Sequence, residues 1–248
     1  MNVEKITPYA SGESKRVQIT QAFDAIADRY DRLNRVLSFG IDILWRRRAL
    51  RLLRADPPAR VLDIATGTAD FALMAARRLP NAQITGIDLS EGMLRIGRAK
   101  AEAAKLDHRV KLQVGDGLSL GFADASFDAV TAAFGVRNFE NMAAGFAEIR
   151  RVVKPGGRIV ILELSEPTAF PMRPLYRFYL RHVIPLAGRL LTGHVREYRY
   201  LPMSIEHVPQ GEAMLDLLRT AGFTECRSQS YTFGICSCYT AIVPHEHG

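Results

Sequence analysis

The chain has 248 residues, of which 48% are hydrophobic and 24% are charged, a composition typical of a globular protein. No apolar run of about 18 residues occurs, so no transmembrane helix is predicted, and the polar residues 1–16 lack the apolar core of a signal peptide. Three cysteines are too few for a disulfide framework, and no cysteine or histidine spacing predicts a metal site. We therefore expect a cytoplasmic protein with no metal.

The net charge of +7 is distributed unevenly along the chain. Residues 1–60 hold 12 Lys/Arg and 7 Asp/Glu (+5), residues 165–201 hold 6 and 2 (+4), and the remainder holds 15 and 17 (−2). Basic surface of this kind suits nucleic acid or anionic lipid, and it also serves simple solubility. The middle of the chain is therefore nearly neutral, with basic segments on either side.

Two amphipathic helices are predicted after a polar leader that covers residues 1–15. Apolar residues recur at helical spacing over 17–30 and again over 41–53. Asp56-Pro57-Pro58 then ends the helical pattern. Residues 1–58 are thus predicted to form an N-terminal helical cap.

The most informative stretch begins at Val61. Residues 61–65 form an apolar run broken only by Asp63, which is typical of a strand buried on both faces of a parallel sheet. Gly67 provides a turn, a helical pattern follows, and a second strand over 83–88 ends in Asp88. An acid about 20 residues after the turn glycine is well placed to accept hydrogen bonds from ribose hydroxyls. The alternative is that Gly67 only makes a turn and Asp88 only caps the next helix.

The loop after the first strand discriminates between cofactors. A dinucleotide site requires three glycines in the pattern G-x-G-x-x-G, whereas residues 65–70 contain one glycine and end in Asp70, which would repel a diphosphate. S-adenosylmethionine carries a ribose and an adenine but no phosphate. It is therefore the cofactor that the loop favours.

Strands and helices alternate through the rest of the core. We predict a helix over 91–104, strands over 110–114 and 127–133, a helix over 141–153, a turn over 154–157 and a strand over 158–164. Such alternation indicates a parallel sheet with right-handed crossovers. Asp116 and Gly117 follow the third strand as Asp88 follows the second. Asp116 is placed to accept a hydrogen bond from the adenine amine. The alternative is that Gly115-Asp116-Gly117 is an ordinary turn.

Residues 165–210 do not continue the alternation of strands and helices. They are too apolar for a solvated loop and predict one or two helices laid over the sheet edge as a lid. A helix over 212–220 and a hairpin of strands over 223–230 and 234–243 follow, so one strand is antiparallel. The predicted fold is a seven-stranded, mostly parallel, doubly wound α/β sheet, divided into 1–58, a core over 59–164, the lid over 165–210, and 211–248.

Several short motifs make a family recognisable. Phe134-Gly135-Val136-Arg137-Asn138 and Tyr198-Arg199-Tyr200-Leu201 are specific, while Lys154-Pro155-Gly156-Gly157 occurs in many methyltransferases. Over residues 17–241 the chain resembles the ubiquinone/menaquinone biosynthesis C-methyltransferases, which are class I, Rossmann-like enzymes. The resemblance implies C-methylation of a demethylated, isoprenylated quinol with S-adenosylmethionine as the methyl donor.

Candidate site residues follow from the residues and the resemblance together. For the cofactor they are Asp63, Gly67, Thr68, Asp88, Asp116, Gly117 and Ala133. The chain departs from the family at Thr66 and Ala69, where the family has glycines, and at Ala133, where some relatives bind the cofactor through serine.

The candidate catalytic residues are Arg137, Asn138, His182 and Tyr200. Arg137 cannot readily act as a base, so we assign it the stabilisation of a phenolate, with Asn138 beside it. An ion pair with Glu163 is the structural alternative for Arg137. His182 is a candidate general base or a packing residue, and Tyr200 bounds the ring or belongs to the core.

The expected partners are the prenylated quinol and, transiently, an anionic membrane surface, so that the protein is peripheral to the membrane. No nucleic acid is expected, and a homo-oligomer is left open. Three other functions remain open: methylation of RNA, which the basic pI of about 9.5 allows; methylation of another aromatic or lipid; and a non-catalytic subunit, which the altered glycine loop allows.

Overall fold

A seven-stranded sheet forms the centre of the molecule. The computed structural model describes residues 2–9, 11–186 and 195–245, and its strands lie in the order β3-β2-β1-β4-β5-β7-β6. Only β7 runs antiparallel to its neighbours β5 and β6. The predicted fold, with one antiparallel strand, is confirmed. The strands are β1 (Arg60–Ile64), β2 (Gln83–Asp88), β3 (Val110–Val114), β4 (Phe127–Ala133), β5 (Val153–Leu164), β6 (Thr224–Tyr231) and β7 (Cys236–Ile242).

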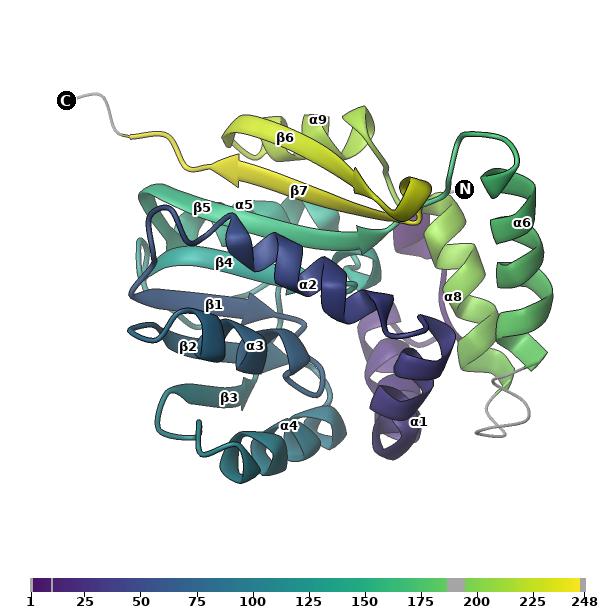
Figure 1. Ribbon diagram of the computed structural model, residues 1–248, viewed down its shortest axis with the longest axis horizontal. Coiled ribbons are helices and arrows are strands. Elements are labelled where there is room, and N and C mark those ends of the chain that lie inside the picture. Colours follow the sequence, from purple (N-terminus) through teal and green to yellow (C-terminus); the bar gives the residue numbers. More distant parts are fainter. Residues whose placement is uncertain (1, 10, 187–194, 246–248) are drawn as a thin grey trace.

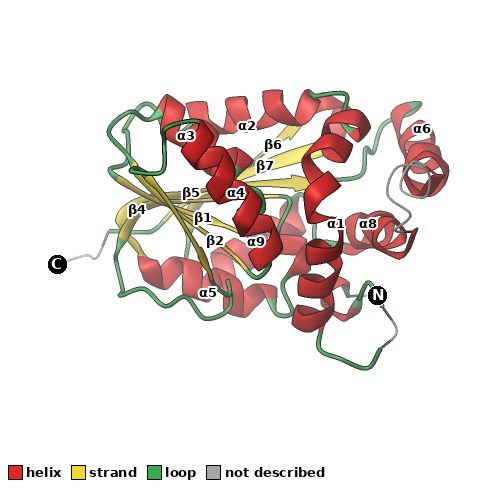
Figure 2. Ribbon diagram, turned by 90° about the horizontal axis from the view of Figure 1, so that it is seen from below, coloured by secondary structure: helices red, strands yellow, loops and turns green. Residues whose placement is uncertain are grey.

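Helices cover both faces of this sheet, as Figure 2 shows. On one face, α2 (Ile41–Arg51), α3 (Asp70–Arg78) and α4 (Glu91–Ala103) enclose a core that includes Trp45 and Leu50. On the other face, α5 (Met142–Val152) and α9 (Glu212–Thr220) contribute Phe146 and Leu218 to a second core. Because both faces are covered, the central strands β1 and β4 are buried along nearly their whole length.

The first long helix, α1 (Lys15–Leu37), is longer than predicted. Ser14 caps its start by accepting a hydrogen bond from the Val17 amide, and the helix continues past Tyr30 because Leu33 extends the buried stripe. Phe39 and Gly40 then adopt positive φ angles of 51° and 74°, which ends α1 and starts α2. The extra turns place Asp31 and Arg35 of α1 against the core.

Strand β5 begins at Val153, whereas the sequence predicts a turn over 154–157 and a strand from residue 158. Val153 pairs with Phe127 of β4, and the Gly156 amide donates to the carbonyl of Val243. The Gly156 φ of 76° accommodates the bend inside the strand. The neighbouring strands therefore keep this stretch in the sheet, and the predicted boundary is wrong.

The segment after β5 forms helices, as predicted. Helix α6 (Met172–Phe178) continues into one π-helical stretch, η3 (Tyr179–Val183), and α8 (Val195–His207) runs beside them. Figure 1 shows α6 and α8 beyond the ends of β4 and β5, next to α1. Residues 187–194 of the predicted lid lie outside the described residues.

Within the described part of the chain, no helix is both long enough and apolar enough to cross a membrane.

Candidate functional site

A cavity lies at the carboxyl edge of the sheet, which is where open α/β sheets bind ligands. We call it the edge cavity. Five of the predicted cofactor residues line it, and Asn138 of the short helix η2 (Val136–Asn138) joins them. These five are Gly67, Asp88, Asp116, Gly117 and Ala133. The strand-end residues are therefore brought together from β1, β2, β3 and β4.

Asp88 ends β2 and faces the loop that follows β1. Its Oδ2 accepts a hydrogen bond of 2.8 Å from the Gly67 amide, and its Oδ1 accepts one of 3.0 Å from the Ser90 amide. Burial raises the pKa of Asp88, and the amide donors act in the opposite direction. The carboxylate is thus held in place by backbone donors and retains lone pairs for a ligand hydroxyl.

The loop after β1 is tightly wound. Gly67 has a φ of 57°, as the sequence predicts, but Ala65 and Ala69 also take positive φ angles, of 51° and 64°. A left-handed conformation costs an alanine about 1–2 kcal/mol. The chain therefore keeps the bent loop at Ala69 without a glycine at that position.

Glycine is also required at the far side of the edge cavity. A Cβ on Gly117 would lie 2.8 Å from Cζ of Phe139, which is closer than carbon atoms approach. The missing side chain lets the backbone after β3 close around the cavity.

The charge of the edge cavity suits a cationic ligand. Its charged lining residues are Arg16, Asp88, Asp116 and Glu140, which sum to −2 when ionised. Arg16 of α1 pairs with Asp116 across 3.3 Å. A sulfonium cofactor without phosphate fits this site, whereas a diphosphate would be repelled.

Asp63 and Thr68 do not line either cavity, so the structure does not place them with the other predicted cofactor residues. The Asp63 carboxylate accepts hydrogen bonds of 2.6 Å from Thr131 and from Thr66, inside the sheet. Burial raises the pKa of Asp63 to about 6, against the effect of these two hydroxyl donors. Asp63 therefore links β1 to β4 and to the loop after β1 through hydrogen bonds, and it lies outside the lining of both cavities.

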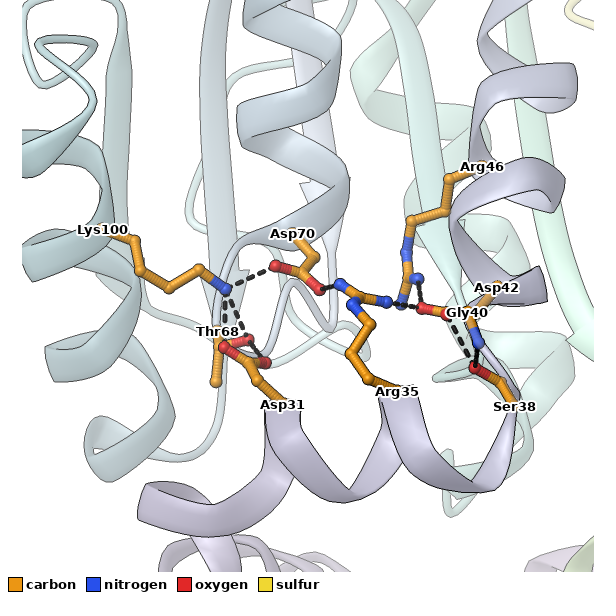
Figure 3. A network of polar contacts seen from close by, with 9 residues as sticks. All are labelled: Asp31, Arg35, Ser38, Gly40, Asp42, Arg46, Thr68, Asp70 and Lys100. Carbon is orange, nitrogen blue, oxygen red and sulfur yellow. Dashed lines mark hydrogen bonds and ion pairs between the residues drawn. The ribbon is translucent and has the colours of Figure 1, made fainter.

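Thr68 instead belongs to a polar network between α1, α2, α4 and the loop after β1 (Figure 3). Its hydroxyl donates to Asp31, and Lys100 contacts Asp31 and Asp70 at 2.8 and 2.5 Å. Arg35 then links Asp70 to Asp42. Since two cations compensate Asp70, its charge is a weaker argument against a diphosphate than the sequence suggests. The acidic edge cavity carries that argument instead.

A second, larger cavity of about 390 Å³ adjoins the first, and we call it the apolar cavity. Its lining residues come from α1, α2, the ends of β4 and β5, and the helices α6 and α8. Its wall is mostly aliphatic and aromatic, and the charged residues among the described lining are Asp42, Arg46 and Arg137. Representative lining residues are Ile26, Leu37, Leu164, Tyr176, Leu180 and Ile205.

The two cavities share a wall. Ile19, Phe23, Tyr30 and Phe134 line both of them. Across this wall the Tyr200 hydroxyl, in the apolar cavity, donates a 2.9 Å hydrogen bond to Oδ1 of Asn138, in the edge cavity. A molecule in the apolar cavity is therefore next to a molecule in the edge cavity, which suits group transfer between them.

Arg137 is buried at this junction and pairs with Glu163 of β5 at 2.7 Å. Burial disfavours the guanidinium charge, but the Glu163 carboxylate outweighs burial and raises the pKa of Arg137. The ion pair anticipated as the structural alternative is thus present. It occupies Nη1 and leaves Nε buried without a hydrogen-bond partner in the described residues. The catalytic role of Arg137 stays a prediction.

His182 is not part of this site. Its side chain is exposed, its ring packs on Phe178 at 4.9 Å, and it is absent from the described lining of both cavities. The turn of η3 directs it away from the cavities. The structure therefore gives no support to His182 as a general base.

Lys15, which sequence reasoning missed, anchors the segment that carries Arg137. Its buried ammonium donates to the carbonyls of Val3, Arg137 and Phe139 at 2.8, 3.0 and 3.3 Å. Burial, with the nearby Arg137 charge, lowers the pKa of Lys15 to about 8. No local pattern reveals this role, because 122 residues separate Lys15 from Arg137.

We expect Lys15→Met to lower the free energy of unfolding by about 2–3 kcal/mol, because three buried carbonyls lose their donor. Chemical denaturation measures this, with Lys111→Met on the exposed edge of β3 as the control. Equal stability of the two variants would contradict the anchoring role.

Comparison with known proteins agrees with this geometry. Residues 10–243 match the model of the ubiE/COQ5 methyltransferase family. The demethylmenaquinone methyltransferase of Bacteroides fragilis is 45% identical over 238 residues, which cover 96% of this chain and 97% of that protein. The ubiquinone/menaquinone biosynthesis C-methyltransferase UbiE of Geobacter sulfurreducens is 42% identical over 237 residues, which cover 95% of this chain and 92% of that protein.

Solved structures show the same fold at low sequence identity. The [4+2]-cyclase SpnF superposes with a TM-score of 0.67 at 20% identity, covering 92% of this chain and 96% of that one. A phosphoethanolamine N-methyltransferase of Haemonchus contortus, solved with S-adenosylhomocysteine, superposes with a TM-score of 0.61 at 18% sequence identity. The match covers 89% of this chain and 60% of that one. Since these neighbours include a cyclase, the fold alone does not determine the reaction.

Proposed function

Because the chain belongs to the ubiE/COQ5 methyltransferase family, and is thus an S-adenosylmethionine-dependent methyltransferase, we propose that it methylates a ring carbon of a demethylated, isoprenylated quinol. Relatives that match over nearly the whole chain are named for demethylmenaquinone and for ubiquinone/menaquinone biosynthesis. The product is then a menaquinol, a ubiquinol precursor, or both.

The apolar cavity is the observation that carries this proposal. An isoprenyl tail needs a long apolar channel, and a quinol ring needs a few polar groups at its inner end. The apolar cavity has this composition, and its two arginines, Arg46 and Arg137, both contact Phe134 of the shared wall. An RNA substrate would instead need an open, basic surface next to the edge cavity.

The residues at the shared wall have distinct tasks. When bound, S-adenosylmethionine supplies an electrophilic methyl group. The quinol would lose an O–H proton to water, so that negative charge spreads to the neighbouring ring carbon. That carbon would take the methyl group as the methyl–sulfur bond breaks and S-adenosylhomocysteine leaves. Loss of the ring hydrogen as a proton and return of one proton to the oxygen would restore the aromatic quinol, with one proton released overall. Arg137 stabilises the phenolate, and Tyr200 with Asn138 fixes the ring relative to the edge cavity.

The test is methyl transfer from labelled S-adenosylmethionine to the reduced and the oxidised form of the same demethylated substrate. The quinol should become labelled and the quinone should not, because only the quinol carries the phenolic proton that activates the ring. Labelling of neither form, in a preparation that binds the cofactor, would contradict the proposal.

We further propose that the cavity mouth faces a membrane. Phe39 and Leu175 line the apolar cavity and are 84% and 59% exposed, so the cavity reaches the surface between α1 and α6. Phe170 and Phe178 extend this exposed apolar surface, at 89% and 62%. Such side chains favour insertion at a bilayer interface, and the substrate tail resides in the bilayer.

On the same segment Arg173, Arg177 and Arg181 pair, among the described residues, with only two acids, Glu166 and Glu206, and the remaining positive charge adds attraction to anionic lipid. We therefore expect flotation with liposomes to increase with the anionic lipid fraction and to decrease with salt. The double variant Phe39→Glu/Phe178→Glu should float less than Val114→Glu, which alters an exposed apolar residue of β3. Equal recovery of all proteins with neutral and anionic vesicles would contradict membrane docking.

A further inference from the structure

The apolar cavity contains a second buried arginine that no sequence motif indicates. Arg46 lies on α2, is 7% exposed, and lines this cavity together with Arg137. Its guanidinium carbon lies 5.2 Å from the centre of the Phe134 ring, and the Phe134 carbonyl accepts from Nη1 of Arg137. Both guanidinium groups thus contact Phe134, a residue of the shared wall: Arg46 lies over its ring, and Arg137 bonds to its carbonyl.

The network of Figure 3 holds the Arg46 side chain in place. Nη1 of Arg46 pairs with Asp42 one turn earlier on α2, and Asp42 also binds Arg35 and the Ser38 hydroxyl. Arg35 and Lys100 in turn bind Asp70, and Lys100 also binds Asp31. Three cations and three acids are linked in this way, so the charge of Arg46 is compensated.

Although the charge of Arg46 is compensated, some of its N–H groups have no hydrogen-bond acceptor in the described residues. Its Nε is buried with no hydrogen-bond partner in the described residues, as is Nε of Arg137, and these are the two such side-chain atoms found there. No hydrogen bond from Nη2 of either arginine reaches a described residue. Nε and Nη2 form the guanidinium edge that binds one or two oxygens side by side. Both arginines keep that edge free of protein acceptors, and an unpaired, buried Nε is costly unless a ligand supplies an oxygen.

A quinol ring has two oxygens on opposite sides, and the function proposed above assigns only one of them, to Arg137. We propose that Arg46 binds the second ring oxygen, across the ring from the methyl-accepting side, and so selects substrates that carry two oxygens. The inference rests on the proposed function, because it deepens the assignment of the same cavity. It makes Arg46 a determinant of substrate choice, separate from the stabilisation of charge by Arg137.

Two substrates with the same isoprenyl tail provide the test. One is the demethylated quinol, and the other keeps the hydroxyl next to the acceptor carbon but lacks the one across the ring. Wild-type protein should show a kcat/KM for the quinol that is about 10–100-fold higher, which is the range for a hydrogen bond from a charged donor. Arg46→Met should reduce this preference towards one, and Arg46→Lys should leave it intermediate.

Arg47→Gln is the matched control, because Arg47 is the exposed neighbour on the same helix. It should leave the preference unchanged. If Arg46→Met lowers kcat/KM for both substrates by the same factor, Arg46 only supports the structure and the proposal is overturned. If Arg46→Met does not fold, the Arg46→Lys variant decides in the same way: an unaltered preference overturns the proposal.

Binding without turnover separates this inference from the proposed function. Trp45 is the one tryptophan of the chain and lines the apolar cavity, so its fluorescence reports ligand entry. In anaerobic titrations without S-adenosylmethionine, wild-type protein should bind the quinol about 10-fold or more tightly than the analogue, and Arg46→Met should bind the two alike. Equal binding of both compounds by the wild type overturns the role of Arg46. Failure of turnover with intact discrimination in binding counts against the reaction only.

Discussion

Arg137→Met is expected to lower kcat by about 10²–10³, the usual loss when one donor to a developing oxyanion is removed. The guanidinium keeps its charge, lines the apolar cavity and has a free edge beside its contact with Glu163. If this edge binds the phenolate mainly in the transition state, the KM for S-adenosylmethionine should change little.

The ion pair with Glu163 offers a purely structural explanation, and it predicts a different outcome. Glu163 is buried, so removing its partner leaves an uncompensated charge and lowers the melting temperature. Melting temperature and kcat must therefore be measured on the same preparation of Arg137→Met. A destabilised variant whose folded fraction keeps its turnover would refute the catalytic role. Glu163→Gln is the comparison variant for Arg137→Met, because it removes the ion pair and retains the Arg137 guanidinium.

Asp88→Ala should weaken the binding of S-adenosylmethionine by about 10–100-fold, equivalent to about 1.5–3 kcal/mol, through loss of charge-assisted hydrogen bonds to the ribose. Isothermal titration calorimetry measures this directly. Asp88→Asn keeps acceptors for the Gly67 and Ser90 amides and should show a smaller loss.

Thr68→Val is the matched control for Asp88, because Thr68 was predicted to bind the cofactor and the structure places it in the polar network instead. It should leave cofactor affinity nearly unchanged. An Asp88→Ala variant that is folded and binds as tightly as wild type would show that Asp88 only caps the loop.

The grouping of strand-end residues in the edge cavity could be predicted from sequence because its signals are local. An apolar strand, a turn glycine and an acid at the next strand end lie within about 30 residues, and the parallel sheet brings such ends together. Gly67, Asp88 and Asp116 meet in the edge cavity for this reason.

Other contacts of the candidate residues could not be predicted, for physical reasons. β1 is buried on both faces, so strand periodicity could not show that Asp63 bonds to Thr131 of β4. The contact of Thr68 with Asp31 arises because α1 continues to Leu37. The roles of Lys15 and Arg46 depend on contacts between distant segments, which no single-sequence pattern records.

The position of the transferred methyl group distinguishes C-methylation of a quinol from other reactions. The protein is incubated with S-adenosylmethionine that carries a trideuterated methyl group and with a demethylated, isoprenylated quinol, and the product is analysed by mass spectrometry and proton NMR. We expect one ring hydrogen to be replaced by the labelled methyl group, with both ring oxygens left unmethylated. A product methylated on oxygen, or no labelled product from protein that binds both compounds, would contradict C-methylation of a quinol.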